Sequence, residues 1–362
     1  MHNSFGEAFQ ITTWGESHGP AIGVVIDGCP AGIPLGEAEI NAALARRRPG
    51  QSKLTTQRKE SDTVEILSGV FQGRTTGMPI HLQLRNQDVR SKDYSHLEEA
   101  FRPGHADYTY QSKYGHRDYR GGGRSSARET ANWVAAGAVA QQLLTQELPL
   151  VVRAWVASVH TIAAPQPDEL PSLQAVDANP VRCPHPETAQ QMEAAIREAR
   201  KNGDTLGGTI RAEVHGLPAG FGEPIFNKLP ARMAYAMLTL NATKGFEWGE
   251  GFASTQLKGS EFNDIMRAGS AGGLETQTNH AGGTLGGISN GMPLWFRVAF
   301  KPVATLMQDQ PGLNHAYEPT TIKGRGRHDP CVLPRAVPVV EALCWLVLAD
   351  FYLLKKLNSP SR

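Results

Sequence analysis

The stretch FQITTWGESHGPAIGVVI, residues 9–26, decides the fold class. Phe9–Trp14 and Ala21–Ile26 are rich in β-branched and aromatic residues, which favours a strand on each side of the turn GESHG. That turn matches the G-x-S-x-G pattern of a hydrolase nucleophile elbow, which requires a helix after the turn. Because a strand follows instead, the sequence favours a β-hairpin with an exposed His18 over a serine hydrolase. A turn without any chemical role is the remaining alternative.

Outward from the hairpin, helical and strand patterns follow one another without an internal repeat or a visible domain boundary. The polar stretch at residues 85–123 is predicted to be a long, ordered functional loop. The last helix is predicted to be amphipathic and to begin at Pro338. The sequence therefore indicates one domain of mixed α and β structure over residues 1–362. Helices are predicted at 37–48, 127–146, 187–202, 227–240 and 338–357, and strands within 63–84, 151–163 and 209–215.

Composition argues against several classes of protein. Lys and Arg number 36 and Asp and Glu 35, so a net charge of +1 argues against a general nucleic-acid coat or a binder of acidic membranes. The four cysteines include no C-x-x-C pair, which argues against structural zinc or another metal. The first residues lack a secretory pattern, and the apolar run at 342–349 is far below the ~20 residues that span a bilayer. We expect a cytoplasmic protein with reduced thiols.

Two cationic segments predict anion sites. The first lies at residues 46–58, where five cations repel one another unless an anionic ligand is bound, although arginines at a helix C-terminus are also favoured by the helix dipole. The second is DYRGGGRSSARET, residues 118–130, which places glycines, arginines and serine hydroxyls just before a helix. A single segment of this kind favours a small phosphate or carboxylate over the repetitive, disordered RGG type of nucleic-acid binder.

Three further segments carry candidate residues. His105 follows a Pro-Gly turn, and it gains an acid–base role only if it meets His18 in space. The glycine-rich segment at 280–291 lacks both the G-x-G-x-x-G and the Walker A patterns, and it is either floppy or able to lie flat against a planar ring. The run GRGRHDPCVLPRA, residues 324–336, is too rich in charge to be buried without a ligand or partners.

These segments together resemble one known family. The blocks GESHGPAIGVVIDGCP, RRRPG, RPGHADYTY, YRGGGRSSARET, NATKGFEWGEGF, GGTLGGISNG, AFKP and GRHDPCVLPRAVPVVEA are similar, in this order, to those of chorismate synthase, over residues 6–350 or so. The resemblance implies an α+β fold, a single layered domain in which helices are sandwiched between antiparallel β-sheets. It also implies a homotetramer.

The resemblance implies an activity as well. Chorismate synthase is a lyase that converts 5-enolpyruvylshikimate 3-phosphate to chorismate and phosphate, the last step of the shikimate pathway, by an anti 1,4-elimination that needs reduced FMN. The resemblance also links NADP and FAD with the family. NADPH is expected as a cofactor only if the enzyme is bifunctional and reduces its own FMN. Otherwise a separate flavin reductase is the expected partner. A binder of flavin or polyanions without turnover is the alternative from another class of protein.

The resemblance also implies a role for individual residues within the matching sequence blocks. His18 is expected to protonate or hold the leaving phosphate, His105 to lie near flavin N1, and Asp329 to lie near flavin N5 and assist hydrogen transfer. Lys53 stands where the family has an arginine, so a point charge replaces a bidentate fork. The expected FMN contacts are Arg124, Ser125, Ser126, Asn241, Ala242, Gly286, Lys301, Pro302, Val303, Ala304, Thr305 and Arg327, and the expected substrate and anion contacts are Arg47, Arg48, Lys53, Arg102 and Arg128.

Overall fold

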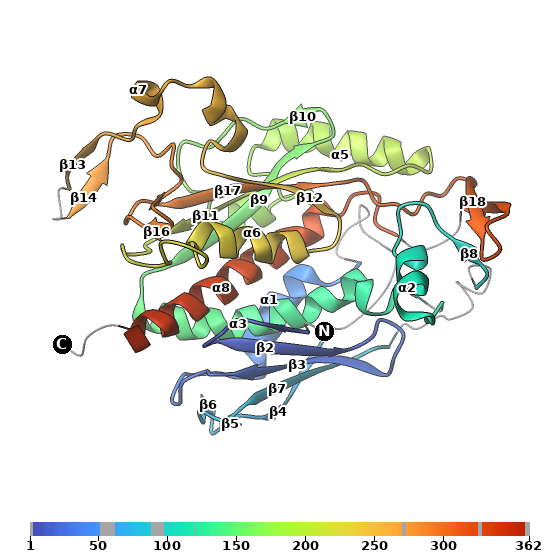
Figure 1. Ribbon diagram of the computed structural model, residues 1–362, viewed down its shortest axis with the longest axis horizontal. Coiled ribbons are helices and arrows are strands. Elements are labelled where there is room, and N and C mark those ends of the chain that lie inside the picture. The colour runs from blue at the N-terminus through green and yellow to red at the C-terminus, as the bar shows by residue number, and fades with distance from the viewer. Residues whose placement is uncertain are drawn as a thin grey trace.

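Two antiparallel sheets enclose a layer of helices (Figure 1). The expected α+β fold, with helices sandwiched between antiparallel sheets, is therefore confirmed. The computed structural model describes residues 3–50, 62–87, 98–119, 121–269, 273–324 and 328–358.

The first sheet contains the hairpin predicted from residues 9–26. Its central strands pair antiparallel from Gln10 opposite Asp27 to Gly15 opposite Ile22, so the turn GESHG lies at one edge of the sheet. A short hairpin of β5 (Val70–Phe71) and β6 (Arg74–Thr75) lies between two of its strands in sequence. In sheet order the strands are β1 (Ser4–Phe5), β2 (Gln10–Gly15), β3 (Ala21–Asp27), β7 (Ile80–Arg85) and β4 (Val64–Ser68).

The second sheet covers the opposite side of the helical layer (Figure 1). Its strands are, in sheet order, β10 (Ile162–Ala163), β9 (Val151–Val159), β11 (Gly208–His215), β17 (Leu294–Phe300) and β12 (Thr243–Trp248). The shorter strands are β13 (Met266–Ala268) with β14 (Leu274–Thr276), β15 (Thr284–Leu285) with β16 (Ile288–Ser289), and β8 (Ala100–Phe101) with β18 (Gln310–Asn314) and β19 (Pro319–Ile322).

The helical layer is formed mainly by α1 (Glu37–Arg47), α3 (Thr130–Glu147) and α8 (Leu333–Asn358) (Figure 1). The helices α3 and α8 approach closely at Gly137, where an added Cβ would lie 2.7 Å from the Cβ of Ala342. The remaining helices are α2 (Asp107–Tyr114), α4 (Leu173–Asp177), α5 (Pro186–Lys201), α6 (Leu229–Thr239) and α7 (Gly259–Phe262), with 3₁₀ turns η2 (Gly123–Ser125), η3 (Ala127–Glu129) and η4 (Gly251–Gln256).

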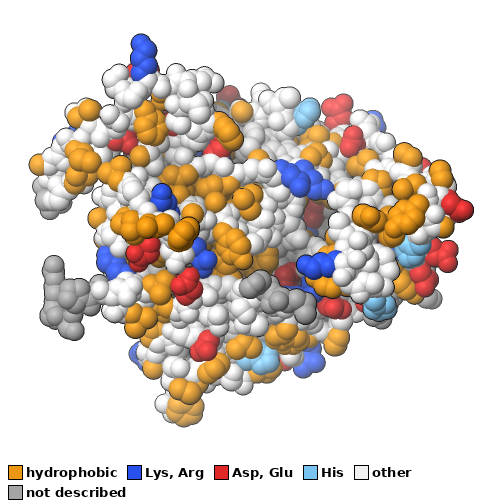
Figure 2. Space-filling view, in the orientation of Figure 1, with side chains coloured by type: hydrophobic (Ala, Val, Ile, Leu, Met, Phe, Trp, Pro, Cys, Tyr) orange, Lys and Arg blue, Asp and Glu red, His pale blue; other side chains and the backbone are white. Residues whose placement is uncertain are grey.

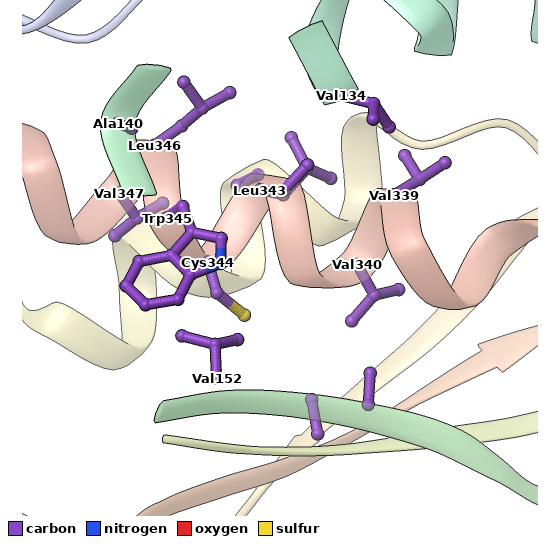
Figure 3. Close-up of a cluster of buried hydrophobic side chains, with 14 of the residues drawn as sticks. Val134, Ala140, Val152, Val339, Val340, Leu343, Cys344, Trp345, Leu346 and Val347 are labelled. Atoms are coloured by element: carbon purple, nitrogen blue, oxygen red, sulfur yellow. The ribbon is translucent and has the colours of Figure 1, made fainter. Parts of the chain in front are cut away.

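Helix α8 is the centre of the core. Figure 3 shows Val340 and Cys344 on the side that faces Val152 of β9, while Val339 and Leu346 lie towards α3. The prediction of an amphipathic helix that begins at Pro338 is wrong, because α8 begins five residues earlier and is buried on nearly all sides up to Tyr352. A helix between two sheets needs no polar face.

Two further observations concern helices. Helix α8 is long and apolar enough to cross a bilayer, but 89% of its most apolar window is buried within the protein, as expected of a core helix.

The prediction that residues 85–123 form a loop is wrong at α2, where a helix spans Asp107–Tyr114. Its first residue is tied to Arg102 and Arg117 by ion pairs, so tertiary contacts stabilise a helix that the local pattern did not indicate.

Candidate active site

A cavity of about 1420 Å³ is lined by segments that lie far apart in the sequence. They include the turn of the β2–β3 hairpin, the end of α1, the segment from Arg102 to Arg128, and the start of α8. Figure 2 shows Lys and Arg side chains around a hollow right of centre, on the face that carries α2. Because pockets for one small ligand usually measure ~300–1,000 Å³, the cavity has room for two.

Most residues predicted for the site line this cavity. Exceptions are Arg48, which is exposed at the end of α1, and Gly286, which lies in the β15–β16 turn. Thr305 contacts the site through a hydrogen bond, and Lys53 and Arg327 lie outside the described residues. The predicted residues in the lining are His18, Arg47, Arg102, His105, Arg124, Ser125, Ser126, Arg128, Asn241, Ala242, Lys301, Pro302, Val303, Ala304 and Asp329.

The charge of the lining is positive. Among the described residues that line the cavity, six arginines and one lysine face only four carboxylates, which gives +3 before any histidine is protonated. Asp62 and Glu129 lie behind the lining and pair with Arg47, Arg128 and Arg124, which reduces the excess to +1. A cavity with an excess of cations attracts anionic ligands. The carboxylates are Glu16, Asp107, Asp118 and Asp329, and the cations are Arg47, Arg102, Arg117, Arg124, Arg128, Lys301 and Arg335.

Asp62 holds two of these arginines in place. Arg47 Nη1 donates to Asp62 Oδ2 at 2.9 Å, Arg128 Nη1 donates to Asp62 Oδ1, and the Asp62 side chain is fully buried. Burial alone would raise the pKa of Asp62, but the two guanidinium groups outweigh it and lower that pKa. Asp62 also adopts a left-handed φ of 48°, a conformation that strains a residue with a side chain.

Arg47 is a buried cation with a complete set of partners. Besides Asp62 it donates to Thr130 Oγ1 at 3.1 Å and to the Ala127 carbonyl at 2.7 Å. Burial lowers its pKa to about 10, although the charge of Asp62 opposes that shift. The guanidinium therefore stays charged at neutral pH and is fixed in orientation.

A second carboxylate, Asp107, organises the other side of the lining. It accepts two hydrogen bonds from the guanidinium of Arg102, at 2.7 and 2.8 Å. It also forms an ion pair with Arg117 at 3.0 Å. Burial opposes ionisation, but these arginines keep the pKa of Asp107 below its usual range. Neither Asp62 nor Asp107 was predicted as a site residue.

His105 is a cavity residue whose imidazole has a strongly lowered pKa. Its Nε2 lies 2.6 Å from Thr305 Oγ1, which fixes the ring. Burial lowers the pKa of His105 to about 4, and the positive charge of Arg102 acts in the same direction while Asp107 opposes it. The imidazole is therefore neutral at pH 7 in the absence of an anionic ligand.

This lowered pKa predicts a pH-dependent stability. Because the folded pKa of about 4 lies below the model value of 6.5, the unfolded chain binds more protons between these values, and the stabilisation is complete above pH 6.5 and lost as the pH falls towards 4. We expect the wild type to lose about 2 kcal/mol relative to His105→Gln between pH 7 and pH 5. Urea unfolding of both proteins at the two pH values measures this, and a constant difference would contradict it.

His18 lies in the turn of the β2–β3 hairpin, as predicted. Its Nδ1 lies 2.9 Å from Ser17 Oγ, and Gly121 packs directly on the ring, where an added Cβ would lie 2.1 Å from Nδ1. Only glycine fits at residue 121 without displacing the imidazole. The hairpin and the glycine-rich segment together therefore fix His18 in the lining.

Asp329 is paired with a cation from α8. Arg335 Nη1 donates to Asp329 at 2.6 Å, and Arg335 Nε donates to the backbone carbonyl of Arg47 at 3.4 Å. Arg335 belongs to the charged segment at 324–336 but was not singled out from the sequence. It connects the start of α8 to the end of α1.

Asn241 and Ala242 form a polar edge of the lining. Asn241 Nδ2 donates to the Ser125 carbonyl at 2.9 Å, while its buried Oδ1 has no hydrogen-bond partner among the described residues. Ala242 adopts a left-handed φ of 69°, and its carbonyl accepts from the backbone of Lys301 at 2.9 Å. A buried acceptor without a partner is costly, and a ligand donor would relieve that cost.

The chain is similar to known proteins over nearly its whole length. The model of the family described as Chorismate synthase matches residues 9–353. Curated chorismate synthases of Opitutus terrae and Cytophaga hutchinsonii are 55% and 53% identical to it, covering 98% of this chain and 97% and 99% of theirs. A solved structure titled "Crystal Structure of Chorismate Synthase" matches with a TM-score of 0.76 at 31% identity, covering 98% of this chain and 94% of that one. The chain therefore belongs to the chorismate synthase family.

Proposed function

We propose that the protein converts 5-enolpyruvylshikimate 3-phosphate to chorismate and phosphate by an anti 1,4-elimination that uses reduced FMN, as the last step of the shikimate pathway. Family membership supports the pathway step. The observation that carries the proposal is the cavity of about 1420 Å³, whose lining joins His18, His105 and Asp329 to six arginines and a lysine. Such a lining suits a substrate with a phosphate and two carboxylates.

The reaction needs no net oxidant. The C3–O bond to phosphate and the C6–H bond break, a new conjugated diene forms, and phosphate and a proton leave. The hydrogen at C6 is not acidic, so a base alone removes it poorly. When bound, reduced FMN would supply electron density for loss of the phosphate and would recover it on loss of the hydrogen.

The lining fits a flavin. The buried Oδ1 of Asn241 is an acceptor without a partner among the described residues, and it suits a ring N–H donor. Pro302, Val303 and Ala304 line the same cavity and offer apolar side chains together with backbone groups. Val303 and Ala304 lack hydroxyls, so we assign flavin contacts there to the backbone.

Three residues of the cavity, His18, His105 and Asp329, are assigned roles in proton transfer and in stabilising charge. We assign His18, oriented by Ser17, as the proton donor to the departing phosphate. Since Thr305 contacts Nε2 of His105, Nδ1 is the nitrogen that acts on a ligand, and the neutral imidazole can donate a hydrogen bond to a reduced, anionic ring. We assign Asp329, which pairs with Arg335, to assist removal of the hydrogen at C6.

We extend the proposal to the protein as a whole. It acts as a homotetramer of single-domain chains in the cytoplasm, binds no nucleic acid, and receives reduced FMN from a separate flavin reductase. Use of NADPH by the protein itself is the alternative, as in a bifunctional enzyme.

Two assays test the proposed function. With substrate and FMN, purified protein is expected to form chorismate anaerobically with dithionite and not aerobically with NADPH. Product in both assays would instead indicate a bifunctional enzyme. A visible flavin spectrum on the protein without product in either assay would identify a binder without turnover, and the proposed function would be rejected.

A further inference from the structure

Two cations of the lining sit at the ends of two helices. Arg47 is the last residue of α1, and Arg335 is the third residue of α8. The spacing of their guanidinium groups therefore depends on how the C-terminus of α1 is held against the N-terminus of α8.

One side chain outside the lining contacts the backbone of both helix ends, in addition to the Arg46–Glu341 ion pair and the Arg335 contact with the Arg47 carbonyl. Arg182 Nη2 donates to the carbonyl of Arg46 at 2.6 Å, and Arg182 Nη1 donates to the carbonyl of Pro334 at 2.5 Å. These carbonyls belong to the residues immediately before Arg47 and Arg335. The planar guanidinium thus fixes the distance between the two backbones at Arg46 and Pro334, directly before Arg47 and Arg335.

Both carbonyls need a partner from outside their helices. The Arg46 carbonyl is one of the last in α1 and has no later helical N–H to accept from. The Pro334 carbonyl would accept from residue 338 of α8, but that residue is Pro338, which has no N–H. Arg182 supplies both missing donors.

Arg182 is itself held firmly. Its side chain is 8% exposed, and its Nε forms an ion pair with Asp177 at 3.1 Å. The carbonyl of Arg182 accepts from Val156 of β9 at 3.0 Å, and its φ of 63° is left-handed. A strained residue that is fixed on both sides is typical of positions that serve a site.

We propose that Arg182 is a positioning residue, which uses the carbonyl left unpaired by Pro338 to lock α8 against α1 and so sets the spacing of Arg47 and Arg335 for an anionic substrate. This inference rests on the proposed function. It concerns an arginine that does not line the cavity and that contacts the backbone carbonyls of Arg46 and Pro334, the residues that precede the two lining arginines.

Steady-state kinetics of chorismate formation test it. For Arg182→Met we expect kcat/KM to fall about 10–100-fold, mainly through KM, because misplaced cations bind the substrate less well. Arg182→Lys keeps the charge but not the planar fork, so an intermediate value is expected. Arg197→Met, on the exposed face of α5, is the matched control and should leave both constants unchanged.

A second substitution separates positioning from stability. Pro338→Ala returns an N–H to the Pro334 carbonyl, so in Arg182→Met it should recover thermal stability, but it should not recover KM because the bridge to Arg46 remains absent. The proposal would be overturned if the double variant recovered both thermal stability and KM. It would also be overturned by a folded Arg182→Met protein with wild-type kcat/KM. If Arg182→Met alone does not fold, the double variant and Arg182→Lys carry the test.

The proposed function and this inference fail separately. A wild type that forms no chorismate rejects the function, whatever Arg182 does. Binding of inorganic phosphate, measured by calorimetry in the same variants, then tests the positioning role without turnover. A dissociation constant for phosphate that is equal in wild type and Arg182→Met would overturn the inference in that case.

Discussion

His105→Ala is expected to lower kcat by ~10²–10⁴, the range for loss of a positioned acid–base group. The imidazole lies in the lining, is fixed by Thr305 at 2.6 Å, and has a pKa of about 4 because of burial and neighbouring cations. An anionic ligand beside it would raise that pKa towards neutrality and make the ring an effective donor. Alanine removes this group without disturbing a helix or strand, since His105 precedes α2.

The assay is anaerobic turnover with reduced FMN at saturating substrate, with circular dichroism to confirm folding. His215→Ala is the matched control, because His215 lies on β11, pairs with Glu213 and does not line the cavity. Its kcat should stay within twofold of wild type. A folded His105→Ala protein with wild-type kcat would remove His105 from the chemistry.

Asp62→Asn is expected to destabilise the protein by about 3–5 kcal/mol, the largest stability effect among the substitutions considered. The change leaves the side chain nearly isosteric but removes the negative charge of Asp62 from between the buried guanidinium groups of Arg47 and Arg128, which then repel each other without it. Urea unfolding at pH 7 measures the loss.

Two comparisons sharpen this test. Glu275→Gln breaks the exposed ion pair with Arg267 and should cost no more than ~0.5 kcal/mol. Added phosphate should recover part of the stability of Asp62→Asn, because an anion bound in the cavity beside Arg47 and Arg128 offsets their charge in the folded protein. A loss below 1 kcal/mol would mean that Arg47 and Arg128 do not depend on Asp62.

The sequence predicted those parts of the fold that depend on local patterns. The hairpin at residues 9–26 and the helix at 37–48 were visible because strand and helix periodicities, and the stop at Pro49-Gly50, lie within a short window. The start of α8 was missed, since a proline usually marks a helix boundary and here lies inside the helix. Nothing local indicates that Arg182 satisfies the carbonyl which that proline leaves unpaired.

The candidate site was predicted unevenly for a similar reason. His18, His105 and Asp329 stand in dense motifs, and all three line the cavity. Asp62 stands in the run KESDTVE, residues 59–65, and its partners are 15 and 66 residues away, so no local pattern distinguishes it from the neighbouring Glu60 and Glu65. Gly286, expected as an FMN contact, lies in the β15–β16 turn outside the lining, and its contact with a flavin stays a prediction.

The burial of α8 has a consequence for how the chain acquires its structure. Every strand of both sheets precedes this helix in the sequence, yet the inner faces of both sheets depend on the helical layer to which it belongs. While the ribosome delivers the chain from its N-terminus, the sheets have no completed core to close upon, and their apolar faces stay accessible to chaperones. Cooperative folding therefore waits for the last helix, and contacts between distant segments make the process slow.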